Sequence, residues 1–160
     1  MKVPKISVIV AVYGVENYIE KCVRSLFEQT LDAVEYIFVN DDTPDNSIVI
    51  LKSVLDEYSE RKNNTHIINF ETNTGVANAR TVGMKLATGK YMIHCDLDDY
   101  LEDDALEVLY KEAVKTDADI VTCDYYREKE DRIEYCVQSY VQTPRECIIN
   151  FYKNPFFPAL

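Results

Sequence analysis

The sequence predicts an α/β fold, a three-layer sandwich with a mostly parallel central sheet. Short apolar runs alternate along the chain with longer stretches of helical periodicity, an order typical of parallel strands joined by helices. The first run, residues 6–12, is apolar on both faces, as expected of a central strand that is covered on both sides. The length of 160 residues suits one compact domain.

Strands and helices alternate through the first half of the chain. Val15, Cys22 and Leu26 belong to an apolar stripe with spacings of three and four residues, which predicts an amphipathic helix. A second helix follows the next strand, and either Asp45 or Ser47 can cap its first turn. We expect, in chain order, strand 6–12, helix 16–29, strand 35–40, helix 48–58 and strand 65–70.

The second half continues this alternation and then departs from it. We expect helix 76–86, strand 91–95, a helix that begins near residue 102, and strand 119–124. Asp103 and Asp104 fall in the first turn of that last helix, where carboxylates favour the helix dipole. After Tyr125, apolar and polar residues alternate from Ile133 to Val141, which predicts a half-exposed antiparallel strand. Residues 144–160 have a short helical pattern that ends in prolines and aromatic residues.

Charge and composition exclude several classes of function. The formal net charge of -11 would repel nucleic acid and anionic lipid, so we expect no nucleic-acid partner. No apolar run approaches the roughly 20 residues that span a bilayer, so we expect no transmembrane segment in this chain. The five cysteines include no C-x-x-C pair, which indicates neither a zinc site nor a complete disulfide framework. We therefore expect a cytoplasmic protein, with any membrane association provided by parts outside this chain.

Three aspartates directly follow a predicted strand. Asp96 and Asp98 are two residues apart in an extended chain and so share a face, while Asp99 can turn aside. The carboxyl end of a strand is where open α/β sheets bind ligands, and paired carboxylates there suit Mg²⁺ or Mn²⁺ bridging to a diphosphate. The alternative is a solvated acidic turn. Spacing alone does not decide between the two interpretations.

Two further polar clusters also follow predicted strands. Asp41 lies on the same rim and can accept a hydrogen bond from a base such as uracil; the alternative for residues 41–45 is a turn and helix cap. Gly75 begins a helix and Arg80 lies inside it, a combination that suits phosphate or nucleotide groups. Taken alone, an ordinary capped helix with an exposed arginine is favoured. Three clusters on one rim favour a binding site.

Aromatic and histidine side chains give a weaker signal. Tyr13 and Tyr100 fall at strand ends, where a ring can stack on a base or a sugar. His66 and His94 lie inside predicted strands, and for both of them packing against the sheet is favoured over a functional role.

With these residues in place, the chain resembles glycosyltransferase family 2 from its start to about residue 115. The segments that carry the likeness are 6–14, 39–47, 73–83 and 87–99. They are similar, in that order, to an opening strand ending P-x-Y-N, a V-D-D-G-S-T-D-N-S segment, an N-x-G...A-R-N-x-G segment and an A-x-G-x-Y...D-x-D-D block. Ala11 and Gly14 depart from the first motif, Asp42 replaces the glycine of the second, and Thr81 replaces the second asparagine of the third.

The resemblance implies the Rossmann-like GT-A fold and a nucleoside-diphosphate-sugar donor, most often UDP-linked, with Mg²⁺ or Mn²⁺ as cofactor. It implies that Asp41 binds the base and that Asp96, Asp98 and Asp99 supply the ribose and metal contacts. The nucleotide-binding residues that we expect are Val12, Tyr13, Asp41, Arg80, Asp96, Leu97 and Asp98. We expect transfer with inversion to a hydroxyl of a saccharide or lipid-linked saccharide, as in polysaccharide biosynthesis.

No motif assigns the catalytic base. Four later carboxylates lie outside any matching motif, namely Asp117, Asp119, Asp124 and Glu146. We therefore expect residues 1–125 to form the nucleotide-sugar-binding core, residues 126–160 to begin the acceptor-side region, and the base to lie beyond Leu160 in a longer protein. The alternative is a noncatalytic nucleotide-sugar-binding domain. A phosphoacceptor receiver domain is disfavoured because it needs a lone aspartate after its strand.

Overall fold

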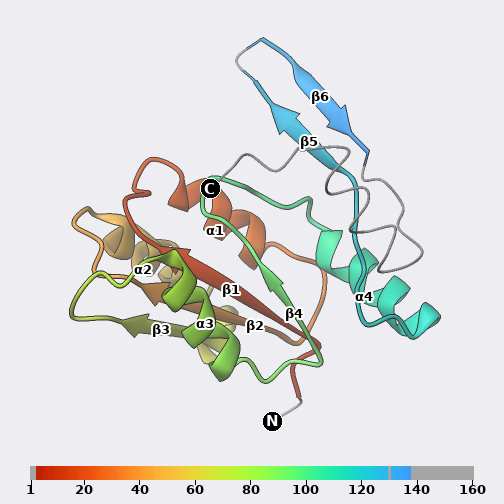
Figure 1. The fold of residues 1–160 in the computed structure, drawn as a ribbon, viewed down its shortest axis with the longest axis horizontal. Coiled ribbons are helices and arrows are strands. Elements are labelled where there is room, and N and C mark those ends of the chain that lie inside the picture. The colour runs from red at the N-terminus through yellow and green to blue at the C-terminus, as the bar shows by residue number, and fades with distance from the viewer. Residues whose placement is uncertain (1–2, 130, 138–160) are drawn as a thin grey trace. The chain divides into compact units, whose positions relative to one another are not determined.

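The computed structural model describes residues 3–129 and 131–137 (Figure 1). The chain divides into two compact units, Met1–Ala118 and Asp119–Leu160. The first unit has the predicted α/β fold, and its elements follow the expected order. The pattern expected over residues 144–160, and the far end of the strand expected up to Val141, lie outside the described residues.

A four-stranded parallel sheet forms the centre of the first unit. Its strands are β1 (Ile6–Val12), β2 (Val34–Asn40), β3 (Thr65–Asn69) and β4 (Tyr91–His94). Their order across the sheet is β3-β2-β1-β4, and each neighbouring pair is parallel. Ile9 in β1 is in register with Ile37 on one side and with His94 on the other. Almost all of β1 and β2 is buried, which explains why these strands are apolar on both faces.

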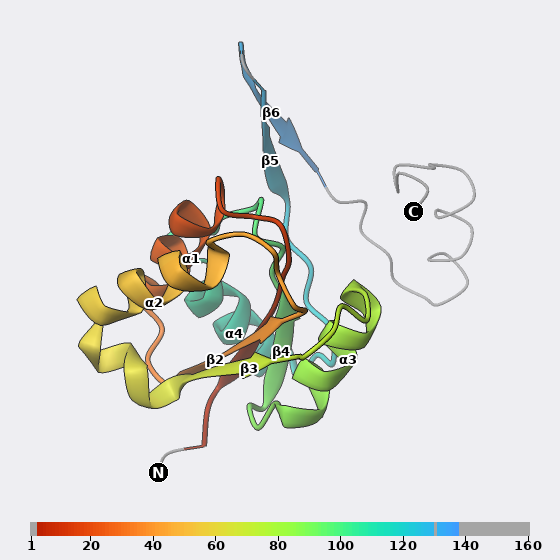
Figure 2. The ribbon, with the colours of Figure 1, turned by 90° about the vertical axis from the view of Figure 1, so that its left-hand side faces the viewer.

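Helices cover both faces of this sheet. They are α1 (Ile19–Phe27), α2 (Ser47–Glu57), the short 3-10 helix η1 (Ser59–Asn64), α3 (Val76–Leu86) and α4 (Ala105–Thr116). Figure 2 shows α1 and α2 on one face and α3 on the other. The larger core cluster joins the sheet to α1, α2 and α4, and the smaller cluster joins it to α3 through Ala79. Within the described part of the chain, no helix is both long and apolar enough to cross a membrane.

Helix α3 lies very close to the sheet at Gly83. A Cβ atom placed on this glycine would lie 2.4 Å from Cγ2 of Ile9 and 3.6 Å from Cγ2 of Val39. Both of those side chains are buried, so neither has free space into which to move. The glycine therefore sets how near α3 approaches β1, and through that distance it sets where the side chains of α3 lie.

Two helices begin later than their periodicity predicts. The N–H group of Glu16 donates to Asp45 Oδ2 at 3.0 Å instead of entering α1, which starts after it. α4 begins at Ala105 rather than near residue 102, with Asp104 as its N-cap residue. The acidic pair expected in the first turn of α4 thus lies just before it. Periodicity shows which residues face the core, whereas hydrogen bonds to distant groups decide where a helix starts.

The described part of the second unit contains a β-hairpin. β5 (Tyr125–Glu128) pairs antiparallel with β6 (Ile133–Cys136), which confirms the antiparallel strand expected after Tyr125. The strand predicted over residues 119–124 is wrong, since these described residues lie outside any strand. A strand forms only where another backbone supplies partners for its N–H and C=O groups, and a short apolar run does not show whether such a partner exists.

Candidate functional site

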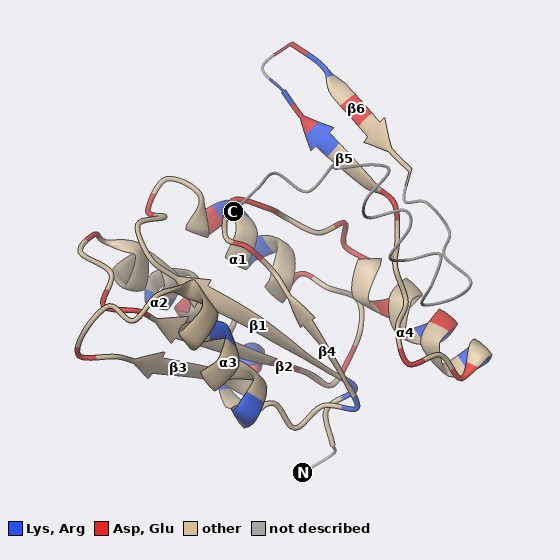
Figure 3. Cartoon of the chain, in the orientation of Figure 1, with Lys and Arg blue, Asp and Glu red and all other residues tan. Residues whose placement is uncertain are grey.

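The carboxyl edge of the sheet brings the predicted clusters together. β1 and β4 are neighbours in the sheet although two strands separate them in the chain, because the connection through α3 returns across the sheet. Ligands of open α/β sheets bind in the crevice outside such a reversal of strand order. Tyr13 follows β1, Asp41 follows β2 and Asp96 follows β4. Acidic residues occur in the loops after β2 and β4, and basic residues occur on α3 (Figure 3).

Asp41 is buried and holds the loop that precedes α3. It is 2% exposed; its Oδ1 accepts the N–H and hydroxyl groups of Thr74 at 2.7 and 3.0 Å, and its Oδ2 accepts the N–H group of Gly75 at 2.8 Å. Gly75 has a φ of 89°, which residues with a side chain rarely adopt. Of the two roles that the sequence left open, the structure shows the turn-forming one. Contact with a base remains a prediction.

The N-cap residue of α2 is Asn46 rather than either expected candidate, but Asp45 bonds to Ser47, the first residue of that helix. Its Oδ1 accepts the N–H group of Ser47 at 3.1 Å and the hydroxyl of Ser47 at 2.6 Å. Partial burial favours the neutral acid, but hydrogen bonds from Ser47, Thr43 and the backbone of Glu16 outweigh it and lower the pKa of Asp45 to about 2. The carboxylate therefore stays ionised near neutral pH.

An ion pair joins α3 to the loop after β4. Arg80 Nη2 donates to Asp96 Oδ1, and the two side chains are 35% and 53% exposed. At such exposure an ion pair contributes only about 0–1 kcal/mol to stability. Its importance lies in the groups that it brings together, because it places a positive charge beside the aspartates in a chain whose net charge is -11.

Two of the predicted nucleotide-binding residues have buried side chains. Val12 is 0% exposed and Leu97 is 3% exposed, and both belong to the larger core cluster. For these residues the prediction can therefore concern only the backbone, and the carbonyl group of Val12 already accepts the N–H group of Asp41 at 3.1 Å. Tyr13, by contrast, is 51% exposed and its ring is available to a ligand.

The loop after β4 carries the aspartates predicted to bind a metal. Asp96, Asp98 and Asp99 are all exposed, and the N–H group of Asp99 donates to the carbonyl group of Asp96 at 3.1 Å. Burial, and then the charges of Asp98 and Asp96, raise the pKa of Asp99 above its ordinary value. Neighbouring carboxylates whose charges repel one another are a donor set that a hard cation stabilises.

This donor set is incomplete as a metal cage. Across residues 3–129 and 131–137, no three His, Cys, Asp or Glu side chains converge as metal ligands. Mg²⁺ usually takes one or two carboxylates together with water and substrate phosphates rather than a cage made only of protein groups. The aspartates therefore fit Mg²⁺ or Mn²⁺ as a site that a bound diphosphate would complete.

The two histidines lie in strands, as predicted, and His66 Nε2 lies 3.7 Å from Glu35 Oε1 on the neighbouring strand. His66 and His94 are both exposed, because β3 and β4 are the outer strands in the order β3-β2-β1-β4. Partial burial and the nearby charge of Arg80 lower the pKa of His94, while Asp96 acts in the opposite direction. His94 thus lies near the Arg80–Asp96 ion pair, and both charges act on it.

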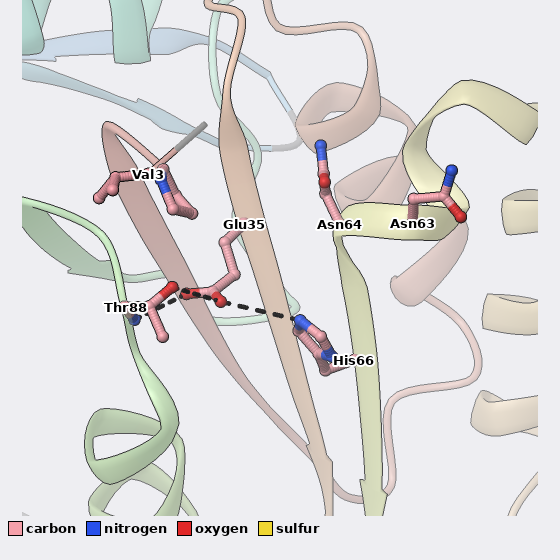
Figure 4. A pocket seen from close by; sticks show the side chains of 7 residues that line it. Val3, Glu35, Asn63, Asn64, His66 and Thr88 are labelled. Carbon is pink, nitrogen blue, oxygen red and sulfur yellow. Dashed lines mark hydrogen bonds and ion pairs between the residues drawn. The ribbon is translucent and has the colours of Figure 1, made fainter. Parts of the chain in front are cut away.

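A cavity of about 330 Å³ at the opposite edge of the sheet is separate from this site. Its lining residues are Val3, Pro4, Glu35, Asn63, Asn64, His66 and Thr88 (Figure 4). The buried carboxylate of Glu35 accepts hydrogen bonds from Ser7 Oγ at 2.6 Å and from the N–H and hydroxyl groups of Thr88, both at 2.9 Å. These bonds join β1, β2 and the turn before β4, so Glu35 has a structural role.

Three residues that were not among the predicted site residues also shape the site. Thr74 supplies two of the hydrogen bonds to Asp41, and a threonine before a helix-starting glycine is a local signal that could have revealed it. Thr43 and Glu16 join the loops after β1 and β2. Nothing local marks Glu16, because its partner Asn46 is 30 residues away.

Known proteins similar to this chain share both sequence and fold. The chain is 38% identical over 133 residues to the uncharacterized glycosyltransferase EpsJ of Bacillus subtilis, covering 83% of this chain and 37% of that protein. It is 42% identical over 122 residues to the glycosyltransferase GlyA of Streptococcus pneumoniae, covering 76% of this chain and 17% of that protein. The chain thus spans less than half the length of either relative.

The solved structure of residues 1–349 of S. aureus TarS in complex with UDP matches with a TM-score of 0.61 and 28% identity, covering 69% of this chain and 32% of that one. A complex of the same TarS segment with UDP-GlcNAc matches equally well. This match confirms the expected GT-A fold with its mostly parallel sheet. The family model described as glycosyl transferase family 2 matches residues 7–157. With almost the whole chain matched, this protein belongs to glycosyl transferase family 2.

Proposed function

We propose that this chain supplies the donor-binding part of a glycosyltransferase that moves a sugar from a UDP-sugar to an acceptor hydroxyl, with inversion and with a divalent cation. The observation that carries the proposal is the Arg80–Asp96 ion pair beside the reversal of strand order between β1 and β4. It gathers positive and acidic groups where a sheet of this kind binds ligands. The ligands of TarS, UDP and UDP-GlcNAc, support the choice of donor class.

The nucleotide base belongs beside Tyr13 and Asp41 in this proposal. The exposed ring of Tyr13 offers a stacking surface, and aromatic stacking on a base contributes about 1–3 kcal/mol. Asp41 Oδ2 accepts one hydrogen bond from Gly75, and a carboxylate oxygen can accept a second. An N–H group of uracil is a suitable donor for that second bond.

The ribose and diphosphate belong beside Asp96 and Arg80. Asp96 accepts hydrogen bonds from the ribose hydroxyl groups, and the Arg80 guanidinium offsets the charge of the phosphates. Asp98, with Asp96 and Asp99 beside it, would hold Mg²⁺ or Mn²⁺ together with oxygen atoms of the diphosphate. When bound, the ion would supply Lewis-acid chemistry that offsets the charge of the leaving diphosphate.

The acceptor hydroxyl of a saccharide or lipid-linked saccharide attacks the anomeric carbon from the face opposite the leaving group. This route inverts the configuration and passes through a transition state with positive charge at that carbon. No residue of the described ranges is assigned as the base that takes the hydroxyl proton. We place the reaction in the cytoplasm, where the four free cysteines among the described residues stay reduced.

Calorimetry with UDP tests the proposal directly. Because an acidic rim repels a diphosphate, we expect UDP to bind at least about tenfold more tightly with Mn²⁺ than with EDTA, a difference of about 1.4 kcal/mol. GDP under the same conditions is the control for recognition of the base. Equal affinity with and without metal contradicts the role of the cation, and no binding of UDP in either condition contradicts the donor class.

A noncatalytic nucleotide-sugar-binding domain is the second candidate. It is favoured by one observation, that the donor-binding residues are all in the first unit while no base is assigned among the described residues. Sugar transfer and donor hydrolysis measured at matched donor occupancy separate the two functions. A longer protein that contains this chain and saturates with donor, yet neither transfers nor hydrolyses it, would establish the binding role.

A further inference from the structure

The loops after β1 and β2 are joined by hydrogen bonds that run in both directions. Three successive backbone N–H groups of the first loop donate to side chains of the second, and one backbone N–H group of the second donates to the first. The pairs are Gly14 N–H to Thr43 Oγ1 (2.9 Å), Val15 N–H to Ser47 Oγ (3.2 Å), Glu16 N–H to Asp45 Oδ2 (3.0 Å) and Asn46 N–H to Glu16 Oε2 (3.1 Å). The two loops thus form one hydrogen-bonded unit.

Asp45 is central to this unit. Besides the N–H group of Glu16, its carboxylate accepts the hydroxyl of Thr43 at 2.7 Å and the hydroxyl of Ser47 at 2.6 Å. Hydrogen bonds to a charged acceptor are about twice as strong as those between neutral groups. Both hydroxyls therefore point their hydrogen atoms at Asp45.

With their hydrogen atoms directed at Asp45, the two hydroxyl groups can accept hydrogen bonds from the first loop. A hydroxyl has one hydrogen to donate, and once Asp45 receives it the oxygen lone pairs remain for other donors. The lone pairs of Thr43 and Ser47 accept the N–H groups of Gly14 and Val15. The charge on Asp45 thus holds the first loop through two intermediate hydroxyls as well as directly.

Tyr13 lies between the strand and the part of the loop that is held in this way. On its N-terminal side Val12 is buried in the core, and on its C-terminal side Gly14 has a φ of 67°, a conformation that suits glycine. We propose that Asp45 is a positioning residue that sets the Tyr13 ring for the nucleotide base by fixing the backbone that follows it. This inference rests on the proposed function, because it takes Tyr13 to contact the base.

The substitution Asp45→Asn tests the inference with almost no change in shape. If the amide oxygen keeps the two hydroxyl groups, the amide nitrogen faces the N–H group of Glu16, and two donors meet. If the amide turns round, the hydroxyls of Thr43 and Ser47 must accept from it, and they lose the orientation that serves the first loop. Either arrangement releases at least one of the bonds between the loops.

A double-mutant cycle on the full 160-residue chain separates positioning from a general loss of stability. With UDP and Mn²⁺ in calorimetry, we expect Asp45→Asn to weaken binding about tenfold when Tyr13 is present and less than about twofold in a Tyr13→Ala background. A general loss of stability would weaken binding by the same factor in both backgrounds. That result, or a Tyr13→Ala chain that binds UDP as the unaltered chain does, overturns the inference.

Variants of Thr43 and Thr65 provide the controls. Thr43→Val removes the hydroxyl between Asp45 and Gly14 and should weaken UDP binding, whereas Thr43→Ser keeps that hydroxyl and should restore it; if Asp45→Asn does not fold, this pair carries the test. Thr65→Val removes a hydrogen bond of 2.9 Å from the threonine hydroxyl to the carbonyl group of Arg61 at the opposite edge of the sheet and should leave UDP affinity unchanged.

The outcomes separate the proposed function from this inference. If the unaltered chain does not bind UDP, the proposed function fails and this inference with it. If it binds UDP and Thr43→Val has no effect, only the inference fails.

Discussion

Asp41 and Asp45 lie in one loop, yet each carboxylate joins that loop to a different neighbour. Asp41 accepts donors from Thr74 and Gly75 before α3, and Asp45 accepts donors within its own loop and from Glu16 before α1. In both cases a charged acceptor satisfies backbone N–H groups that lie outside any helix or strand. At the scale of single residues, each of these two carboxylates accepts hydrogen bonds from several donors, and these bonds hold the loops at the carboxyl edge of the sheet in place.

Asp98 differs from these two residues because its carboxylate is exposed, and we propose a role for it in metal binding rather than in the stability of the fold. We expect Asp98→Asn to remove most of the difference in UDP affinity between Mn²⁺ and EDTA, since Asn is a much weaker ligand for a hard cation. The melting temperature should hardly change, because a surface substitution usually alters stability by about 0.5 kcal/mol or less. Calorimetry and thermal unfolding measure the two effects.

Asp56→Asn is the matched control for Asp98→Asn. It makes the same chemical change and the same change in net charge on α2, at an exposed residue paired with Lys62 at 2.5 Å. UDP affinity should stay metal-dependent in this variant. A large fall in the melting temperature of the Asp98 variant would instead show that Asp98 stabilises the fold.

Glu35 predicts a pH dependence of stability. Burial raises the pKa of its carboxyl, but hydrogen bonds from Ser7 and Thr88, aided by His66, outweigh burial and hold that pKa below its ordinary value of 4.5. A group with a lowered pKa in the folded state stabilises the fold above the ordinary pKa, and this contribution is lost as the pH falls through the lowered value.

We expect Glu35→Gln to lower the free energy of unfolding at pH 7 by about 2 kcal/mol, because the Gln amide would present a donor to groups that are themselves donors. The difference between the two proteins should shrink as the pH is lowered below 4.5. Urea unfolding at a series of pH values measures it. A difference that stays constant from pH 7 down to pH 3 would show that ionisation of Glu35 is not involved.

At the scale of elements, α3 connects the fold to the site. Its first residue follows the turn held by Asp41, its inner face packs on the sheet at Ala79 and Gly83, and Arg80 reaches the loop after β4. A helix is stiff over this length, so a displacement at Gly83 is carried to Arg80. The close approach at the glycine therefore serves both packing and the position of the guanidinium.

Gly83→Ala tests this connection. The added methyl group would overlap Ile9, so we expect a loss of about 1–3 kcal/mol in stability, as for other overpacked cores. Because α3 must move outward, UDP affinity should fall as well. Ala79 is not a suitable control since it lies in the same interface. Thr81→Ala is suitable, because Thr81 is only partly buried and its hydroxyl donates to the carbonyl group of Ala77 in its own helix. A Gly83→Ala protein as stable as the original would contradict the close approach.

At the scale of the whole molecule, the strand order and the charge act together. The order β3-β2-β1-β4 puts the reversal of strand order beside β1, where sheets of this kind bind ligands. The acidic residues in the loops after β2 and β4 give this edge the same sign of charge as the whole chain. In our proposal an anionic donor binds there only with local positive charge, which Arg80 and a cation would provide. The proposed dependence of donor binding on metal would then be a property of the whole edge of the sheet.

Truncation tests whether the first unit is sufficient for donor binding. It has its own core, and it contains every residue to which we assign a donor contact. We expect a chain that ends at Ala118 to fold cooperatively and to bind UDP with Mn²⁺ within about twofold of the full chain, because a unit with its own core folds alone. Calorimetry compares the two proteins. A loss of affinity much larger than that would place a donor contact in residues 119–160.

Local pattern was sufficient to predict most of the fold and the general position of the site. Apolar periodicity gave four strands and four helices of the first unit in order, because burial of one face repeats at the period of the element itself. The rule that ligands meet the carboxyl ends of parallel strands placed Tyr13, Asp41 and Asp96 on one rim. The motifs that resemble glycosyltransferase family 2 gave the family, which the family model confirms.

Only the tertiary structure decided what the individual polar residues do. It showed that Asp41 accepts hydrogen bonds from Thr74, that the Leu97 side chain belongs to the core, and that Arg80 forms an ion pair with Asp96. It also showed that residues 119–124 form no strand. Each of these outcomes depends on whether a hydrogen-bonding or packing partner is present. That partner lies far away along the chain, so the local pattern of apolar and polar residues does not predict it. The sequence by itself therefore determined the elements and the rim, whereas hydrogen bonds and packing between distant segments determined the role of each side chain on it.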